Sequence, residues 1–172
     1  MVSYRIVEQV SRKKKSMSGV LRKSMVFFAV IFVLMGIMIS QAFMLAGFLC
    51  AGLYFVYDIL SQRDYEYTME DNSLVIDVIY GRKYRKTAHD LDLRTMEVTA
   101  PNWHQAVAQY RKDGGTIKLK KYDYTSYDDN IPYYTMIIEE NGKKIKLLLD
   151  LTEEMLQVLK SMYPSKVFCT KS

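Results

Sequence analysis

The chain contains one long run, residues 24–57, without a single Asp, Glu, Lys, Arg or His. A single helix of that length would reach about 50 Å, whereas the hydrocarbon core of a bilayer is about 30 Å thick. Ser40-Gln41 is the most polar dipeptide inside the run. We therefore predict two transmembrane helices, near residues 22–39 and 43–61, which a tight turn joins into a hairpin.

The basic residues at the start of the chain predict the orientation of this hairpin. Residues 1–23 carry seven basic side chains and one acidic side chain, so this segment accounts for the positive net charge of the chain, which is +5 overall. Lys and Arg beside a first span stay in the cytoplasm, and a second span returns the chain to the same side. We therefore expect a basic cytoplasmic tail over residues 1–21, both termini in the cytoplasm, and a multi-pass protein of the cell membrane. The apolar run continues too far for a cleaved signal peptide.

After residue 61 the sequence becomes rich in Tyr, Val, Ile and Thr, with Gly, Asn and Asp between the runs, which is typical of strands and hairpins. The strongest turn signal is Asn141-Gly142. The pattern predicts about seven strands, at residues 65–70, 73–80, 84–89, 93–99, 116–122, 133–140 and 143–149. It also predicts a helix at residues 103–112, which Asn102 and Gln105 would cap, and a final helix from Asp150 or Thr152 to Pro164.

These elements predict an α+β membrane protein. A two-helix transmembrane hairpin over residues 22–61 precedes a small antiparallel β-sandwich or barrel over residues 62–164, whose C-terminal helix covers an apolar face. Residues 165–172 are expected to be a loose tail. Residues 2–12 have apolar side chains at helical spacing, and we interpret them either as a short helix on the membrane surface or as a disordered start.

Three segments of the chain, residues 65–76, 81–87 and 92–98, resemble the bacterial pleckstrin-homology-like (PH-like) membrane proteins. Residues 92–101 and 151–164 are also similar to those of a small family of two-span membrane proteins. The resemblance implies a PH-like fold at a membrane and brings no catalytic residues. It also reveals one difference. Eukaryotic PH domains that hold phosphoinositides have basic residues around the first strand–strand loop, whereas that loop is predicted here to be Glu70-Asp71-Asn72, which would repel a phosphate.

Two groups of basic side chains are candidates for contact with anionic lipid head groups at the membrane surface. One group lies in the tail and the other at a predicted hairpin end: Arg12, Lys13, Lys14, Lys15, Arg22 and Lys23, then Arg82, Lys83, Arg85 and Lys86. Each group also has an ordinary structural interpretation. The first would set topology only, and the second would be a solvated hairpin end that discourages aggregation through sheet edges.

No pattern in the sequence predicts catalysis, a cofactor or a metal site. The two histidines, His89 and His104, match no spacing of metal ligands, and no nucleophile elbow or phosphate-binding glycine loop is present. Cys50 and Cys169 have no partner nearby in the sequence, so no disulfide is expected. The segment from residue 63 onward has equal numbers of basic and acidic side chains and gives no reason to expect nucleic acid as a partner. The tyrosines of residues 122–134 either pack in the core or form an aromatic surface for a partner.

The function that these observations favour is a membrane-anchored interaction or scaffold module, which presents a cytoplasmic PH-like domain to an unknown protein partner. The alternative is a subunit of a transporter or other membrane complex, although residues 24–57 lack the Asp, Glu, Lys, Arg and His side chains that mark transport pathways. Small residues in the second span favour close helix packing, either within the hairpin or between copies of a homo-oligomer: Ala42, Ala46, Gly47, Ala51 and Gly52.

Overall fold

The computed structural model describes residues 5–12, 16–61, 63–81, 83–111 and 114–169. The chain forms two compact units. The β unit comprises residues 1–12, 64–78 and 86–172, and the helical unit comprises residues 13–63 and 79–85.

The β unit begins with a strand that the sequence analysis did not predict. This strand, β1 (Arg5–Ser11), pairs antiparallel with β2 (Arg63–Glu70), in a register that runs from Arg5↔Glu70 to Ser11↔Asp64. The surface helix or disordered start expected for residues 2–12 is therefore wrong for residues 5–11. Residues 5–11 of the predicted tail over residues 1–21 form this strand.

An acidic residue, Glu8, is the reason that β1 is not recognised as a strand in the sequence. Ile6 and Glu8 are half-buried and Val10 is buried, whereas Val7 and Gln9 are exposed, so burial alternates with a period of two. Glu8 lies on the inner side because its carboxylate accepts a hydrogen bond from the backbone N–H of Thr152 (3.2 Å). A charged residue at an inward position removes the apolar alternation by which a strand is normally recognised.

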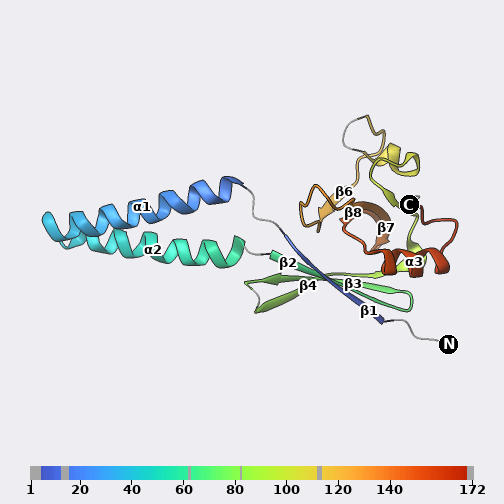
Figure 1. Ribbon diagram of the computed structural model, residues 1–172, viewed down its shortest axis with the longest axis horizontal. Coiled ribbons are helices and arrows are strands. Elements are labelled where there is room, and N and C mark those ends of the chain that lie inside the picture. Colours follow the sequence, from blue (N-terminus) through green and yellow to red (C-terminus); the bar gives the residue numbers. More distant parts are fainter. Residues whose placement is uncertain (1–4, 13–15, 62, 82, 112–113, 170–172) are drawn as a thin grey trace. The chain divides into compact units, whose positions relative to one another are not determined.

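The strands form two four-stranded sheets, of which the first has the order β1-β2-β3-β4 and the second the order β5-β7-β8-β6 (Figure 1). The remaining bounds are β3 (Ser73–Tyr80), β4 (Tyr84–Asp92), β5 (Val98–Pro101), β6 (Lys120–Asp123), β7 (Tyr134–Glu140) and β8 (Lys143–Leu149). Strands β7 and β8 are joined by the predicted Asn141-Gly142 turn, in which both residues have positive φ (50° and 74°). Strand β6 pairs with β8 in parallel.

Both sheets and the C-terminal helix contribute to the core. The largest fully buried side chains include Tyr67, Met69, Leu74 and Ile76 from the first sheet and Met136, Ile138, Leu147 and Leu149 from the second. The final helix, α3 (Glu153–Met162), buries the stripe Met155, Leu156 and Leu159, and its N-cap is Thr152, one of the two predicted candidates. The Tyr163 hydroxyl donates a hydrogen bond to the Asn72 side chain (2.8 Å) and ties the end of this helix to the turn between β2 and β3.

Three predicted elements differ in type or extent from those in the structure. The Asp92 side chain accepts a hydrogen bond from the Arg94 backbone N–H (3.0 Å) and begins a 3-10 turn, η1 (Leu93–Thr95), inside the predicted strand 93–99. The predicted helix 103–112 is a 3-10 helix, η2 (Gln105–Tyr110), whose N-cap is His104 and not Asn102. Strand β6 covers only the end of the predicted strand 116–122.

A further difference concerns the C-terminus, where residues 166–168 pack against β5. The Thr99 backbone N–H donates to the Lys166 carbonyl (2.9 Å), and the Phe168 N–H donates to the Thr99 carbonyl (2.8 Å). Val167 is fully buried. The expected loose tail is therefore wrong for this segment, and its residues 170–172 lie outside the described part of the chain.

Two long helices make up most of the helical unit. Helices α1 (Ser16–Met38) and α2 (Ala42–Ser61) lie side by side and turn at the predicted Ser40-Gln41 (Figure 1). In α1 the stretch Gly19–Met38 is long and apolar enough to cross a membrane, whereas the apolar stretch of α2, Ala42–Tyr57, is shorter. By this criterion one helix in the described residues is a candidate span.

Glycine allows the two helices to approach closely. A Cβ atom on Gly47 of α2 would lie 2.9 Å from Val33 Cγ2 and 3.2 Å from the Ala29 carbonyl oxygen, both on α1. A Cβ atom on Gly52 would meet nothing within 4 Å. At Gly47, the small residue therefore serves packing inside the helix pair.

The helix pair is inserted between two neighbouring strands of one sheet. Strand β1 precedes α1 and β2 follows α2, and the strand ends Ser11 and Asp64 are paired. The first strand–strand connection is therefore the helix pair itself. The acidic Glu70-Asp71-Asn72 loop, which the sequence analysis compared with the first loop of eukaryotic PH domains, is the connection between β2 and β3.

Replacing Gly47 should weaken the packing of α1 on α2. The substitution Gly47→Leu forces a side chain against Val33 and the α1 backbone, and we expect a loss of about 1–3 kcal/mol, as for overpacked cores. Thermal unfolding of the full chain in detergent micelles, followed by circular dichroism, measures this loss. Gly52→Leu is the matched control and should unfold at the wild-type temperature. Equal melting temperatures for all three proteins would contradict this packing.

The Glu8 carboxyl group should make stability depend on pH. Burial raises its pKa above the ordinary value and the negative charge of Asp150 adds to this, although the hydrogen bonds to Thr152 oppose it. The folded chain therefore binds this proton more tightly than the unfolded chain, and the resulting stabilisation, present in acid, is lost as the pH rises through the folded pKa.

We therefore expect the Glu8→Gln variant to be as stable as the wild type in acid and more stable than the wild type at neutral pH. The melting temperature of the full chain in micelles, measured from pH 4 to pH 7.5, checks this. Glu70→Gln, which alters an exposed carboxylate at the end of β2, is the control. If the wild type instead became more stable than Glu8→Gln as the pH rises, the expected direction of the Glu8 pKa shift would be wrong.

Candidate functional site

A cavity of about 390 Å³ opens at the end of β6 and β8. Its lining comes from β6, from the loop of residues 124–133, from Trp103, which precedes η2, and from the end of β8 with Asp150, which follows it. The lining residues are Trp103, Lys121, Asp123, Thr125, Tyr127, Asp128, Asp129, Ile131, Pro132, Tyr133, Leu148 and Asp150. All of them belong to the β unit.

Three exposed apolar side chains are among the residues that line the cavity. Trp103, Tyr127 and Ile131 expose 57 %, 39 % and 44 % of their surfaces. Among the described residues outside the helix pair and its turn, six large hydrophobic side chains are exposed, and these three all line this cavity. Exposed apolar groups that gather at one concave place mark interaction sites, whereas scattered ones need no explanation.

The polar part of the cavity is built by aspartates that shape the loop. Asp150 is buried and accepts a hydrogen bond from the Ser126 backbone N–H (2.7 Å). Asp128 accepts one from the Asn130 N–H (3.1 Å), and the Ser126 hydroxyl accepts one from the Asp128 N–H (3.2 Å). These contacts bind backbone N–H groups of the loop, which has no helix or strand of its own.

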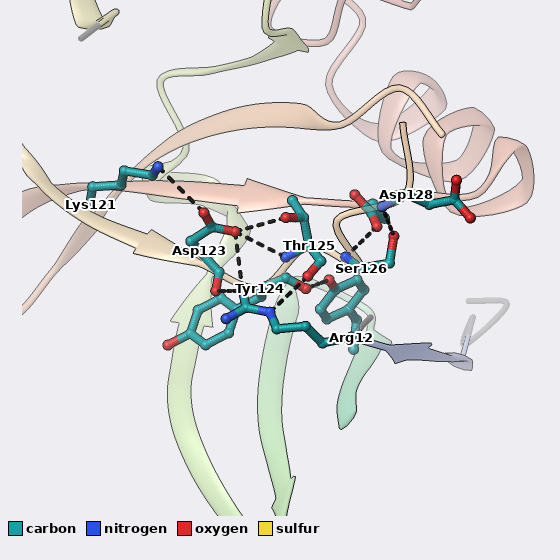
Figure 2. A network of polar contacts seen from close by, with 9 residues as sticks. Arg12, Lys121, Asp123, Tyr124, Thr125, Ser126 and Asp128 are labelled. Carbon is teal, nitrogen blue, oxygen red and sulfur yellow. Dashed lines mark hydrogen bonds and ion pairs between the residues drawn. The ribbon is translucent and has the colours of Figure 1, made fainter. Parts of the chain in front are cut away.

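Arg12, the residue that follows β1, fastens the first strand to this loop (Figure 2). Its Nε donates to the Thr125 carbonyl (3.0 Å), and its Nη2 donates to the Asp123 carbonyl and to Asp123 Oδ1 (3.2 Å). Asp123 also accepts hydrogen bonds from the Thr125 N–H (3.3 Å) and hydroxyl (2.8 Å), and it lies 3.4 Å from Lys121 Nζ. The guanidinium group thus links β1 to one wall of the cavity through charge-assisted hydrogen bonds.

Tyr127 adopts a backbone conformation that residues other than glycine rarely adopt. Its φ is +60°, in the left-handed region, which is uncommon for a bulky residue. The Arg12 guanidinium lies 4.3 Å from the centre of the Tyr127 ring and 4.7 Å from that of Tyr65. This cation–π stack supports the exposed tyrosine from one side and leaves part of its surface to the cavity.

The tyrosines of this region divide between the two roles that the sequence left open. Tyr124 and Tyr134 are buried, and the Tyr67 hydroxyl donates to the Tyr124 carbonyl (2.7 Å). Burial raises the pKa of the Tyr67 hydroxyl above its usual range, so the group stays protonated as a donor. Tyr127 and Tyr133 line the cavity. The region is therefore partly core and partly surface.

The predicted membrane-contact residues occupy different places. Arg12 is bound within the β unit, whereas Lys23 is exposed on α1. Lys83, which precedes β4, and Arg85 and Lys86, at the start of that strand, are exposed. The remaining candidates, Lys13, Lys14, Lys15 and Arg82, together with the side chain of Arg22, lie outside the described residues. Contact of these groups with lipid remains a prediction.

Neither histidine is part of this site. His89 on β4 is buried, with its Nδ1 2.7 Å from Glu140 Oε1 on β7 and its ring 4.5 Å from that of Tyr122. This contact ties the two sheets together next to a second cavity of about 490 Å³. Within the described residues no group of three or more His, Cys, Asp and Glu side chains could hold a metal ion.

Sequence reasoning missed the central features of this site. Trp103 is the only tryptophan of the chain, but its exposure could not be read from its position in a predicted helix. The ion pair between Arg12 and Asp123 joins residues that are distant in the sequence and depends on β1, which was not predicted. The cluster of aspartates and tyrosines in residues 122–134 was the one available signal.

Two sheets that are completed by a C-terminal helix are consistent with a PH-like domain. A family model agrees with this class, because the model of the Bacterial PH-like domain (DUF6106) matches residues 6–169. The chain belongs to this family, and the match begins within β1. A search of curated proteins and a search of solved structures each gave no significant match.

Removing the Arg12 guanidinium should destabilise the β unit. Arg12→Ala leaves two backbone carbonyls and part of the Asp123 carboxylate without their donor, and we expect a loss of about 2 kcal/mol. Urea unfolding of the full chain in micelles measures this loss, and Lys118→Ala, at an exposed position before β6, is the control. Hydrogen exchange should also rise at residues 124–127. Wild-type stability of Arg12→Ala together with unchanged exchange would refute the proposed link.

Proposed function

We propose that this chain is a membrane-anchored interaction module, in which α1 and α2 cross the bilayer as a hairpin and hold the PH-like domain at the cytoplasmic face. The module binds a protein partner, and we assign it no catalytic step. The exposed basic residues at the start of β4 and in α1 would contact anionic head groups.

The observation that carries this proposal is the pairing of β1 with β2 across the helix pair. The Cα partners Ser11 and Asp64 stand opposite each other in one sheet, so the chain leaves the β unit and returns to it at adjacent positions. A folded sheet cannot have neighbouring strands on opposite sides of a bilayer. The apolar segment between them must therefore cross the membrane an even number of times, or not at all.

The surface of the helix pair favours two crossings. The stretch Gly19–Met38 is long and apolar enough to cross a membrane, and little of it is buried. Large side chains such as Phe27, Phe48 and Phe55 are more than half exposed. Water does not tolerate such a surface in a soluble protein, whereas lipid does. The full α2 helix (Ala42–Ser61) would measure about 30 Å, which matches the hydrocarbon core.

Labelling of single cysteines tests this arrangement in intact cells. Cys169 is exposed and serves as the reporter for the C-terminus, after Cys50 has been replaced by Ser. A membrane-impermeant maleimide should leave Cys169 unlabelled until the cells are permeabilised. In a chain without native cysteines, Ser40→Cys, placed in the turn between the helices, should be labelled from outside, whereas Arg5→Cys on β1 should not.

The same series separates the other arrangements. Labelling of Cys169 in intact cells would show that the C-terminus lies outside the cell, which is the opposite orientation. Protection of Ser40→Cys in intact cells would show that the helices do not reach the outer face. Release of the protein from membranes by alkaline carbonate would refute the anchor altogether.

A further inference from the structure

The cavity beside the loop of residues 124–133 carries a net negative charge. Four aspartates and one lysine line it, and Arg12, which binds Asp123 from behind, still leaves the negative groups in excess. Asp129 is exposed at the rim, and Asp150 is buried at the wall. This balance disfavours phosphate and anionic head groups and favours a cation.

The apolar wall adds a second requirement. Trp103, Tyr127 and Ile131 offer aromatic faces and aliphatic surface within the same cavity as the carboxylates. The π faces of Trp and Tyr attract guanidinium and ammonium groups, and aromatic side chains are the usual anchors of protein interfaces. A ligand that satisfies both parts must carry a cation beside an apolar group.

The volume sets the scale of this ligand. A cavity of about 390 Å³ holds one or two side chains and not a folded surface. The loop is already fixed by Asp150, Asp128 and Arg12, so little ordering entropy would be lost on binding.

We infer that this cavity binds an extended segment of a partner protein in which Arg or Lys stands next to an aromatic or aliphatic residue. The basic group lies among the carboxylates of Asp128, Asp129 and Asp150, and its neighbour packs on Trp103 and Ile131. This assignment rests on the proposed function, because it names the chemistry of the partner that the module binds.

A peptide library tests the inference with the full chain. Random heptapeptides displayed on phage are selected against the protein in detergent micelles, and peptides that also bind Trp103→Ala are discarded. The selected sequences should be enriched in Arg or Lys beside an apolar residue. Since Trp103 is the only tryptophan, a synthetic peptide of the best sequence should shift its emission to shorter wavelength.

Charge variants then test the polar contact. The affinity of the fluorescently labelled peptide should fall about two- to five-fold with Asp129→Asn, as for a partly exposed ion pair, and more than ten-fold with Trp103→Ala. Glu70→Gln, which removes an exposed carboxylate outside the cavity, should leave the affinity unchanged. Trp103→Phe keeps an aromatic side chain at this position and should retain most of the affinity for the peptide. It is therefore the control for loss of the folded structure in Trp103→Ala.

Three results would overturn the inference. In the first, the library yields no enriched sequence or enriches acidic sequences. In the second, a bound peptide leaves the Trp103 emission unchanged. In the third, vesicles of phosphatidylethanolamine and phosphatidylglycerol shift that emission without any peptide. The last result would assign the cavity to a lipid head group. None of these outcomes depends on the cysteine labelling, so the anchor and the cavity can fail separately.

Discussion

The antiparallel pairing of β1 with β2 is the contact on which the arrangement of this chain depends. It closes a connection that contains the whole helix pair, and without it β2 would become the edge of the first sheet. The entropic cost of closing a loop grows only slowly with its length, and here the inserted segment is not a free loop, because α1 and α2 pack on each other. A long insertion between neighbouring strands is therefore compatible with a stable sheet.

Two charged side chains extend the influence of β1 beyond its own sheet. Glu8 accepts a hydrogen bond at the N-terminus of α3, where a helix presents unsatisfied N–H groups, and Arg12 binds the loop that lines the cavity. The strand that precedes the helix pair is thereby connected to the second sheet, to the C-terminal helix and to the candidate site. The tying of β1 and the shape of the cavity are parts of one network, in which Arg12 supports Tyr127 from one side.

Much of the fold could be predicted from the sequence, because apolar periodicity and turn residues are local signals. Strands β3 and β8, the Asn141-Gly142 turn and the stripe of α3 follow from them directly. Strand β1 could not be predicted, since Glu8 occupies an inward position for a reason that lies at Thr152, far along the chain. The cavity could not be predicted either, because the exposure of Trp103 and the partner of Asp123 are set by tertiary contacts and not by spacing.

The division of the β unit by the helix pair has a consequence for biosynthesis on the proposed membrane arrangement. The ribosome completes β1 before either helix, and it makes every other strand after both. The domain cannot assemble until the second helix has been inserted correctly. A chain that crossed the bilayer only once would leave β1 and β2 on opposite sides of it. Folding of the domain would then serve as a test of membrane topology, and a misinserted chain would present an incomplete sheet to the proteases of the cell.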